Sequence, residues 1–135
     1  MDGDTATSEQ VIGAAVEVHK ELGPGLLESA YRACLVHELR LQGVRVEAEV
    51  PLPLHYRGLM LDCGYRLDLV VAGELIVELK AVQALDPLHL AQLLTYLKLA
   101  AKPVGLLINF NVPLLKLGVR RVVHCLASAP SAPPR

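Results

Sequence analysis

The sequence predicts a single α/β domain in which a mixed β-sheet is flanked by helices. The chain has 135 residues, which is the length of one ordinary domain. Its apolar residues recur at helical spacing in three segments, and in the other segments they alternate or run continuously. The segments follow the order α-α-β-β-β-α-β, with a last segment that is either a strand or a short helix, and this order is typical of helices packed on a mixed sheet. We expect residues 1–7 to be a flexible N-terminus, residues 8–126 to be the domain, and the Ala/Ser/Pro-rich residues 127–135 to be a disordered tail.

Two helices open the domain. Thr7 and Gln10 fit a capping box at the start of the first helix. The Gly-Pro-Gly run at 23–25 ends it, because neither residue suits a helix interior. The second helix is predicted over residues 26–42, with Gly43 as its C-terminal stop. Helical spacing gives the first helix a predicted buried stripe of Ile12, Ala15, Val16, His19 and Leu22.

The remaining segments are mostly strands. Residues 44–50 alternate between apolar and charged side chains, which predicts a half-buried strand, and Pro51 limits its far end to an edge or an exit. Asp86 is placed to cap a third helix, and Pro87 suits the first helical position. A hairpin is predicted from two strands at residues 65–71 and 75–82, and the third helix covers residues 87–101. Residues 104–110 are predicted to be a buried strand, and residues 119–126 a strand or a short helix.

Composition excludes several classes of protein. A hydrophobic content of 53% with a net charge of -1 excludes intrinsic disorder, and three irregularly spaced cysteines exclude a disulfide scaffold. We find neither a membrane span nor a signal peptide, so we expect a cytoplasmic protein that does not enter the membrane. The mean hydropathy of +0.40 is high for a monomer and is compatible with a homo-oligomer.

Charge is distributed unevenly along the chain. All 14 acidic residues lie at or before Asp86, whereas the residues after it include six Lys or Arg and no acid. This basic section either contacts a polyanion or only keeps an apolar segment in solution. Under the first alternative, the predicted nucleic-acid-binding residues are Lys98, Lys102, Lys116, Arg120 and Arg121.

The predicted hairpin carries the most informative polar residues. A three-residue turn at 72–74 would place Asp68 opposite Glu78, and Lys80 would share a face with Glu78 because residues two apart in a strand do so. Facing carboxylates are unfavourable unless a cation offsets their charge. Oxygen ligands favour Mg²⁺ or Mn²⁺, in which case Lys80 would orient or deprotonate a water or stabilise charge on a phosphate. The alternative is a cross-strand pair that Lys80 neutralises on an exposed face.

The helices add further candidates. Glu28 lies on the largely apolar stripe of the second helix together with Tyr31, and a buried carboxylate needs a partner. Gln92 and Tyr96 are four residues apart and therefore adjacent on the third helix. Each has a plainer interpretation: Glu28 can pair with Arg32 on the surface, and the tyrosines and His19 can belong to the core.

A family resemblance connects these residues. Gly25, Glu28 and Tyr31 form a G-x-x-E-x-x-Y motif, and residues 11–123 resemble the GxxExxY proteins, a bacterial family placed in the PD-(D/E)XK nuclease superfamily. Leu67 stands where superfamily members often carry Pro. The other segments that carry the resemblance are Val18-His19-Lys20, Tyr65-Arg66-Leu67-Asp68, Val77-Glu78-Leu79-Lys80, Gln92-Leu93-Leu94-Thr95-Tyr96 and Leu107-Ile108-Asn109-Phe110-Asn111.

The resemblance implies a restriction-endonuclease-like fold and a catalytic site. In that site Asp68, Glu78 and Lys80 would be the acidic and basic triad. Glu28 would be the carboxylate from the preceding helix, and His19 would contribute to the metal site. Gln92 and Tyr96 would form the Q-x-x-x-Y element. We therefore expect a Mg²⁺- or Mn²⁺-dependent nuclease with DNA as the expected substrate; the alternative is a non-catalytic nucleic-acid-binding or protein-assembly module that retains the fold.

Overall fold

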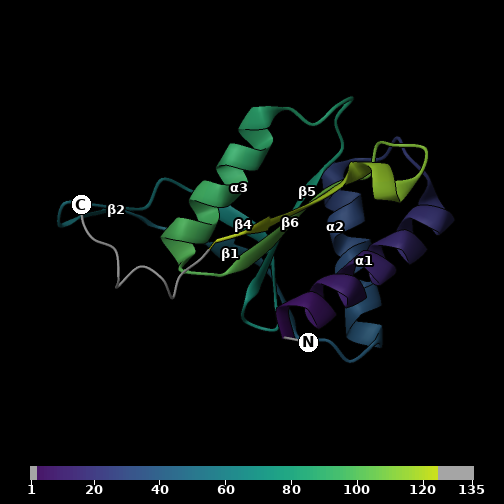
Figure 1. Cartoon of the computed structure of the whole chain (residues 1–135), viewed down its shortest axis with the longest axis horizontal. Helices are drawn as coiled ribbons and strands as arrows, with labels where there is room; N and C mark the ends of the chain where they lie inside the picture. The colour runs from purple at the N-terminus through teal and green to yellow at the C-terminus, as the bar shows by residue number, and fades with distance from the viewer. Residues whose placement is uncertain (1–2, 125–135) are drawn as a thin grey trace.

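The computed structural model describes residues 3–124, which form a five-stranded sheet with two helices on one face and one helix on the other (Figure 1). None of the helices in this part of the chain is long and apolar enough to cross a membrane. The elements in chain order are α1 (Gly3–Leu22), α2 (Glu28–Leu41), β1 (Val46–Pro51), β2 (Leu54–Tyr56), β3 (Leu59–Leu61), β4 (Arg66–Val71), β5 (Leu75–Lys80), α3 (Pro87–Ala100), β6 (Val104–Asn109), the 3-10 helix η1 (Leu115–Gly118) and β7 (Val119–Val123).

The sheet is mixed, as predicted. Its strand order is β1-β4-β5-β6-β7, and of these described strands only β5 and β6 pair in parallel. A parallel pair needs a crossover connection, and α3 provides it between these two strands. The restriction-endonuclease-like α/β fold class expected from the sequence is confirmed.

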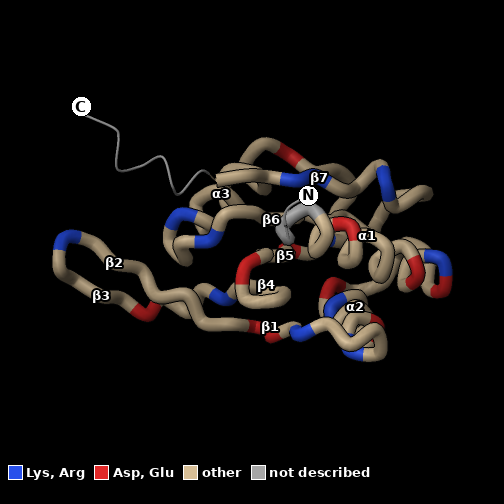
Figure 2. Tube along the Cα trace, turned by 60° about the horizontal axis from the view of Figure 1, so that its bottom comes forward, with Lys and Arg blue, Asp and Glu red and all other residues tan. Residues whose placement is uncertain are grey.

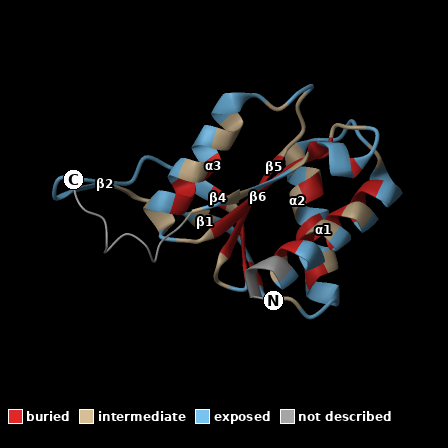
Figure 3. Ribbon diagram, viewed as in Figure 1, coloured by how far each residue is buried: buried red, intermediate tan, exposed pale blue. Residues whose placement is uncertain are grey.

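Two apolar cores hold the layers together, one on each face of the sheet (Figure 3). The first core joins α1 and α2 to the sheet, and Tyr31, Leu35 and Leu39 of α2 are fully buried in it. The second core lies under α3, where Leu93 and Leu97 pack on Ile76. Residues 69–71 of β4 and 75–77 of β5 alternate between these cores, as neighbouring strand residues do. The alternation breaks at Asp68, because Leu67 belongs to the second core and Leu69 to the first.

The first helix differs from its prediction in two ways. It begins at Gly3 rather than after a cap at Thr7, because no Gly or Pro interrupts the chain between Asp4 and Ile12. The predicted buried stripe was also wrong in part. Ile12 and Val16 are only half-buried and Leu22 is exposed. The helix has apolar residues on two adjacent faces, and it packs on the core mainly through the face that carries Val11, Ala14 and Val18. The buried residues of α1 are Ser8, Val11, Ala14, Ala15, Val18 and His19.

Other boundaries agree closely with the sequence. The Asp86 side chain accepts a hydrogen bond from Leu88 N at 2.8 Å, so it caps α3 as predicted. The last described segment is a strand, β7, preceded by η1. The predicted tail, residues 127–135, lies outside the described residues.

A second hairpin, β2–β3, was not predicted. It extends from the body of the protein (Figures 1 and 2) and exposes Tyr56, Leu59 and Met60. Its strands are only three residues long and follow two prolines, so the sequence lacks the alternation that identified the other strands. This hairpin carries part of the apolar surface that explains the high mean hydropathy.

Candidate active site

Asp68 and Glu78 meet where β4 and β5 separate. The pairs Val71↔Leu75 and Leu69↔Val77 confirm the three-residue turn and the register predicted from it. At the next pair, Asp68 and Glu78, hydrogen bonds to the side-chain carboxylates take the place of backbone–backbone hydrogen bonds. The Asp68 N–H donates to Glu78 Oε2 at 2.9 Å, and the Leu79 N–H donates to Asp68 Oδ2 at 2.8 Å. Each carboxylate is therefore held by the backbone of the opposite strand.

The neighbouring strand is also irregular at this level. Strand β1 pairs regularly with β4 on both sides of Glu49, which itself has a φ of 53°. A positive φ is costly for a residue with a side chain, and such strain occurs often at functional sites. Asp68 is thus the residue at which β4 loses regular pairing with both of its neighbours.

Arg32 of α2 connects these two acidic residues. Its Nη1 lies 3.5 Å from Asp68 Oδ1, and its Nη2 lies 3.9 Å from Glu49 Oε2. The Arg32 and Asp68 side chains are only 22% and 18% exposed, whereas Glu49 is 64% exposed. The contact with Asp68 is therefore the better shielded from solvent, and it adds a positive charge that sequence reasoning did not place at the site.

Burial and charge combine to perturb Glu78. This residue is 5% exposed. Burial, and after it the negative charge of Asp68, raise the pKa of Glu78 to about 8, while Lys80 acts in the opposite direction. Burial, followed by the charge of Glu78, also raises the pKa of Tyr96 above its usual value. Lys80 and Tyr96 are thus close enough to Glu78 for their charges to interact.

The oxygen donors fit a hard divalent cation. Asp68 and Glu78 provide carboxylate oxygens, the ligand type that Mg²⁺ and Mn²⁺ prefer, and a cation would remove the cost of ionising Glu78 beside Asp68. Among residues 3–124, no three His, Cys, Asp or Glu side chains are grouped so that they could hold a metal. Glu28 and His19 therefore do not join this pair in a ready three-residue set.

Glu28 and His19 nevertheless lie at the end of the sheet that carries Lys80. Glu28 is half-buried in the first turn of α2, one turn before Tyr31, whose ring stacks on Phe110 at 4.4 Å between centroids. The Phe110 N–H in turn donates to the Lys80 carbonyl oxygen at 2.9 Å. His19 Nε2 lies 2.8 Å from the Val112 carbonyl oxygen, so the position of His19 in the core is satisfied without a metal.

Tyr31 has a structural role in the G-x-x-E-x-x-Y motif. Its hydroxyl donates to the Gly23 carbonyl oxygen and accepts a hydrogen bond from Leu26 N. Gly25 has a φ of 103°, a conformation that favours glycine. The glycine and the tyrosine thus shape the turn before α2, and this turn positions Glu28.

Gln92 and Tyr96 lie together on α3, as their spacing predicted. They line a small cavity of about 220 Å³ with Tyr65, whose ring centroid is 6.1 Å from that of Tyr96. Gln92 is exposed and Tyr96 is 8% exposed. Tyr96, which lines this cavity, also interacts electrostatically with the buried Glu78.

The five predicted nucleic-acid-binding residues do not all lie on one face of the sheet. Arg120 and Arg121 are consecutive in β7 and so point to opposite faces of the sheet. Arg121 Nε donates to the Ser8 hydroxyl on the α1 side, and Lys102 Nζ donates to the Gly73 carbonyl oxygen at the β4–β5 turn. Lys98 lies in the last turn of α3, and Lys116 lies in η1.

Sequence reasoning also missed the contribution of Asn109. This side chain is 1% exposed, and its amide makes hydrogen bonds to both the N–H and the carbonyl oxygen of Val82. It thereby holds the chain that leaves β5 just after Lys80. The available signals were a polar residue at the end of an otherwise apolar strand and its place in one of the segments that carry the family resemblance.

Comparison with known families agrees with this geometry. Residues 5–122 match the family model of the PD-(D/E)XK nuclease superfamily. The chain belongs to this superfamily, whose nucleases generally use divalent metal ions. Searches among curated proteins and among solved structures give no match.

Proposed function

We propose that this protein is a Mg²⁺- or Mn²⁺-dependent nuclease that hydrolyses phosphodiester bonds of nucleic acid, with DNA as the expected substrate. The observation that carries the proposal is the meeting of Asp68 and Glu78 where β4 and β5 separate, with Lys80 two residues further along β5. A buried carboxyl whose pKa is raised by burial and by a neighbouring carboxylate, as for Glu78 beside Asp68, is energetically costly, and such groups are concentrated at functional sites. Within the superfamily, we place the chain in the GxxExxY family on the motif at Gly25, Glu28 and Tyr31.

The residues have distinct roles in this proposal. Asp68 and Glu78 would hold the cation, and Glu28 and His19 would be further candidate ligands at the same end of the sheet. A divalent cation held there supplies positive charge against the developing charge on the phosphate. Lys80 positions the attacking water or stabilises the phosphate oxygens, and Gln92 with Tyr96 orients the substrate or Lys80.

A cleavage assay tests the proposal. Single-stranded and double-stranded DNA and RNA are incubated with the protein and Mn²⁺ or Mg²⁺, and products are resolved on a gel. We expect cleavage by the wild type, loss of cleavage in Asp68→Ala and Lys80→Ala, and normal cleavage in Lys20→Ala. Lys20 is a suitable control because its side chain is 70% exposed on α1 and pairs with Glu17. Full activity in both site variants would refute the proposal.

The second candidate is a non-catalytic module that retains the fold. The Arg32–Asp68 contact favours it, because this ion pair offers Asp68 a partner other than a metal. Calorimetric titration with Mg²⁺ or Mn²⁺ separates the two functions. Saturable binding that is lost in Glu78→Ala supports the nuclease, whereas the absence of binding at millimolar metal supports the module.

A further inference from the structure

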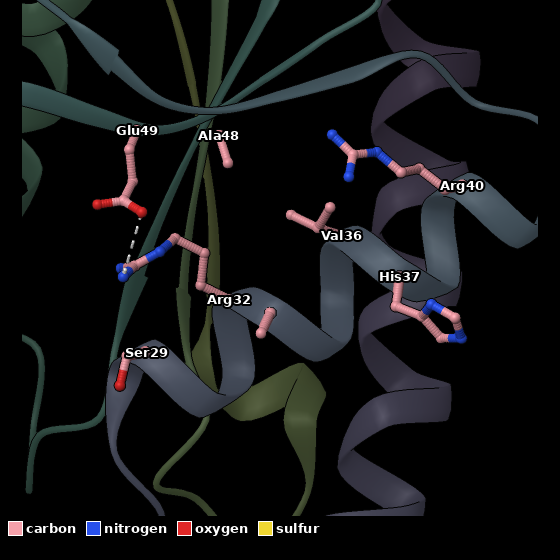
Figure 4. A pocket seen from close by; sticks show the side chains of 8 residues that line it. Ser29, Arg32, Val36, His37, Arg40, Ala48 and Glu49 are labelled. Carbon is pink, nitrogen blue, oxygen red and sulfur yellow. Dashed lines mark ion pairs between the residues drawn. The ribbon is translucent and has the colours of Figure 1, made fainter.

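A groove lies between α2 and the edge strand β1, next to the candidate active site (Figure 4). Its volume is about 420 Å³. Three small or apolar side chains form its middle, and three charged side chains flank them. These residues are Ala33, Val36, Ala48, Arg32, Arg40 and Glu49.

The groove presents two guanidinium groups with spare hydrogen-bond donors. Arg32 and Arg40 are eight residues apart on α2, which corresponds to about 12 Å along the helix axis. Arg40 Nη2 donates to the Val46 carbonyl oxygen at 3.2 Å, and this bond uses one of the five N–H donors of a guanidinium. Ser29 adds a hydroxyl at one end, while the His37 ring points away from the groove (Figure 4).

Within residues 3–124, Glu49 is the only acidic residue that lines the groove, and its ion pair with Arg32 is weak. The two groups are 3.9 Å apart, and Glu49 is 64% exposed. Exposed pairs of this kind contribute little free energy. An incoming anion can therefore replace Glu49 as the partner of Arg32.

Arg32 connects the groove to the candidate site, because it contacts Asp68 as well as Glu49. We propose that the α2–β1 groove binds the sugar–phosphate backbone of the nucleic-acid strand, with Arg32 and Arg40 contacting phosphates on one side of the scissile bond. The inference rests on the proposed nuclease function. Guanidinium groups match phosphate geometry through paired hydrogen bonds, and the apolar middle suits the sugar. A strand in a duplex advances about 3.4 Å per nucleotide, so several phosphates would pass between the two arginines.

The proposal assigns the phosphate contacts to an element that the charge distribution along the sequence did not indicate. The acid-free C-terminal section supplied the predicted basic residues, yet the structure disperses them. Arg32 and Arg40 belong to the acidic front half and become a pair only because α2 places both on one groove.

Fluorescence anisotropy tests the groove directly. The probe is a short fluorescein-labelled single-stranded DNA, and every protein carries Lys80→Ala so that the probe stays intact in Mg²⁺. We expect Arg40→Gln to weaken binding about tenfold, which corresponds to roughly 1.4 kcal/mol, and to lower the slope of log K against log salt by about 0.7. Glu49→Gln should tighten binding about two- to threefold, because it removes the competing anion.

Two further variants make the test selective. Lys20→Gln changes net charge by the same amount as Arg40→Gln and should leave binding unchanged. Ala48→Glu adds a carboxylate to the groove while keeping the bond from Arg40 to Val46, so weaker binding in this variant cannot be ascribed to a damaged fold. Thermal unfolding of each variant checks that the fold persists.

The outcomes separate this inference from the proposed function. Weaker binding in Arg40→Gln and Ala48→Glu, with tighter binding in Glu49→Gln, supports the proposal that the α2–β1 groove binds the sugar–phosphate backbone. A second outcome is that the wild type cleaves DNA while Arg40→Gln and Ala48→Glu bind the probe with the same affinity as Lys20→Gln. Nucleic-acid binding in the groove is then refuted, and the nuclease proposal stands. If the protein neither binds nor cleaves any nucleic acid, both are refuted.

Discussion

Replacing Glu78 by Gln should stabilise the metal-free protein at alkaline pH. Burial, and then the charge of Asp68, raise the pKa of Glu78 from 4.5 to about 8. Because the folded state binds this proton more tightly than the unfolded state does, the stabilising contribution is complete below pH 4.5 and is lost as the pH rises to about 8. At about 1.36 kcal/mol per pH unit, the loss reaches up to about 5 kcal/mol. Gln cannot ionise, and its amide oxygen can still accept the Asp68 N–H.

Urea unfolding measures this effect. At about pH 8.5 Glu78→Gln should unfold at a higher urea concentration than the wild type, and at about pH 4 the two should unfold alike. Mg²⁺ at about 100 times its Kd should add about 2.7 kcal/mol to the wild type at the higher pH and add little to the variant. Glu17→Gln is the matched control, because that side chain is 58% exposed. An identical pH dependence in the wild type and in Glu78→Gln would show that the Glu78 carboxyl is not perturbed in the folded protein.

Three further substitutions test the surrounding structure. Tyr31→Phe keeps the ring stacking but removes both hydrogen bonds of the hydroxyl, so it should lower the unfolding free energy by about 1–3 kcal/mol in urea; an unchanged midpoint would contradict its role in the turn. Glu49→Gly should raise stability by about 0.5–1 kcal/mol, because the positive φ costs a side chain about 1–2 kcal/mol and glycine loses part of that gain in entropy; a lower thermal midpoint would show that the conformation is not strained. Gly118→Ala would place a Cβ 2.1 Å from the Asn109 carbonyl oxygen and should destabilise by about 2 kcal/mol or more, whereas Gly13→Ala, where nothing lies within 4 Å of the added Cβ, should not destabilise thermally.

The sequence allowed the sheet and its register to be predicted where side chains repeat strongly. Alternation predicted β1, and the assumption of a three-residue turn between β4 and β5 placed Asp68 opposite Glu78, in agreement with the observed register. The β2–β3 hairpin could not be found in this way, because three-residue strands show no measurable period. The buried face of α1 was also beyond reach, because apolar residues on two adjacent faces leave the choice to tertiary packing.

The chemistry of the site was harder to predict than its acidic residues. The sequence suggested Arg32 only as a surface partner of Glu28, whereas its contacts with Asp68 and Glu49 depend on how close α2 lies to β4 and β1. The positive φ of Glu49 arises where the ladder is interrupted, and a strand-like sequence gives no sign of it. The C-terminal basic residues were grouped by their position in the chain, whereas strand alternation sends neighbours such as Arg120 and Arg121 to opposite faces.

The balance of charges at the site favours a function over a purely structural role. Ionised Asp68 and Glu78 carry two negative charges, and Arg32 and Lys80 bring two positive charges near them. If the four groups served only to neutralise each other, ionising the buried Glu78 would not be unfavourable. Its raised pKa shows that Lys80 does not compensate for burial and for Asp68. A divalent cation bound to the two carboxylates would correct this deficit and would leave the whole group with excess positive charge, which is the sign that a phosphodiester requires. Under the proposed function, these four side chains would therefore bind a cation first and a phosphate after it.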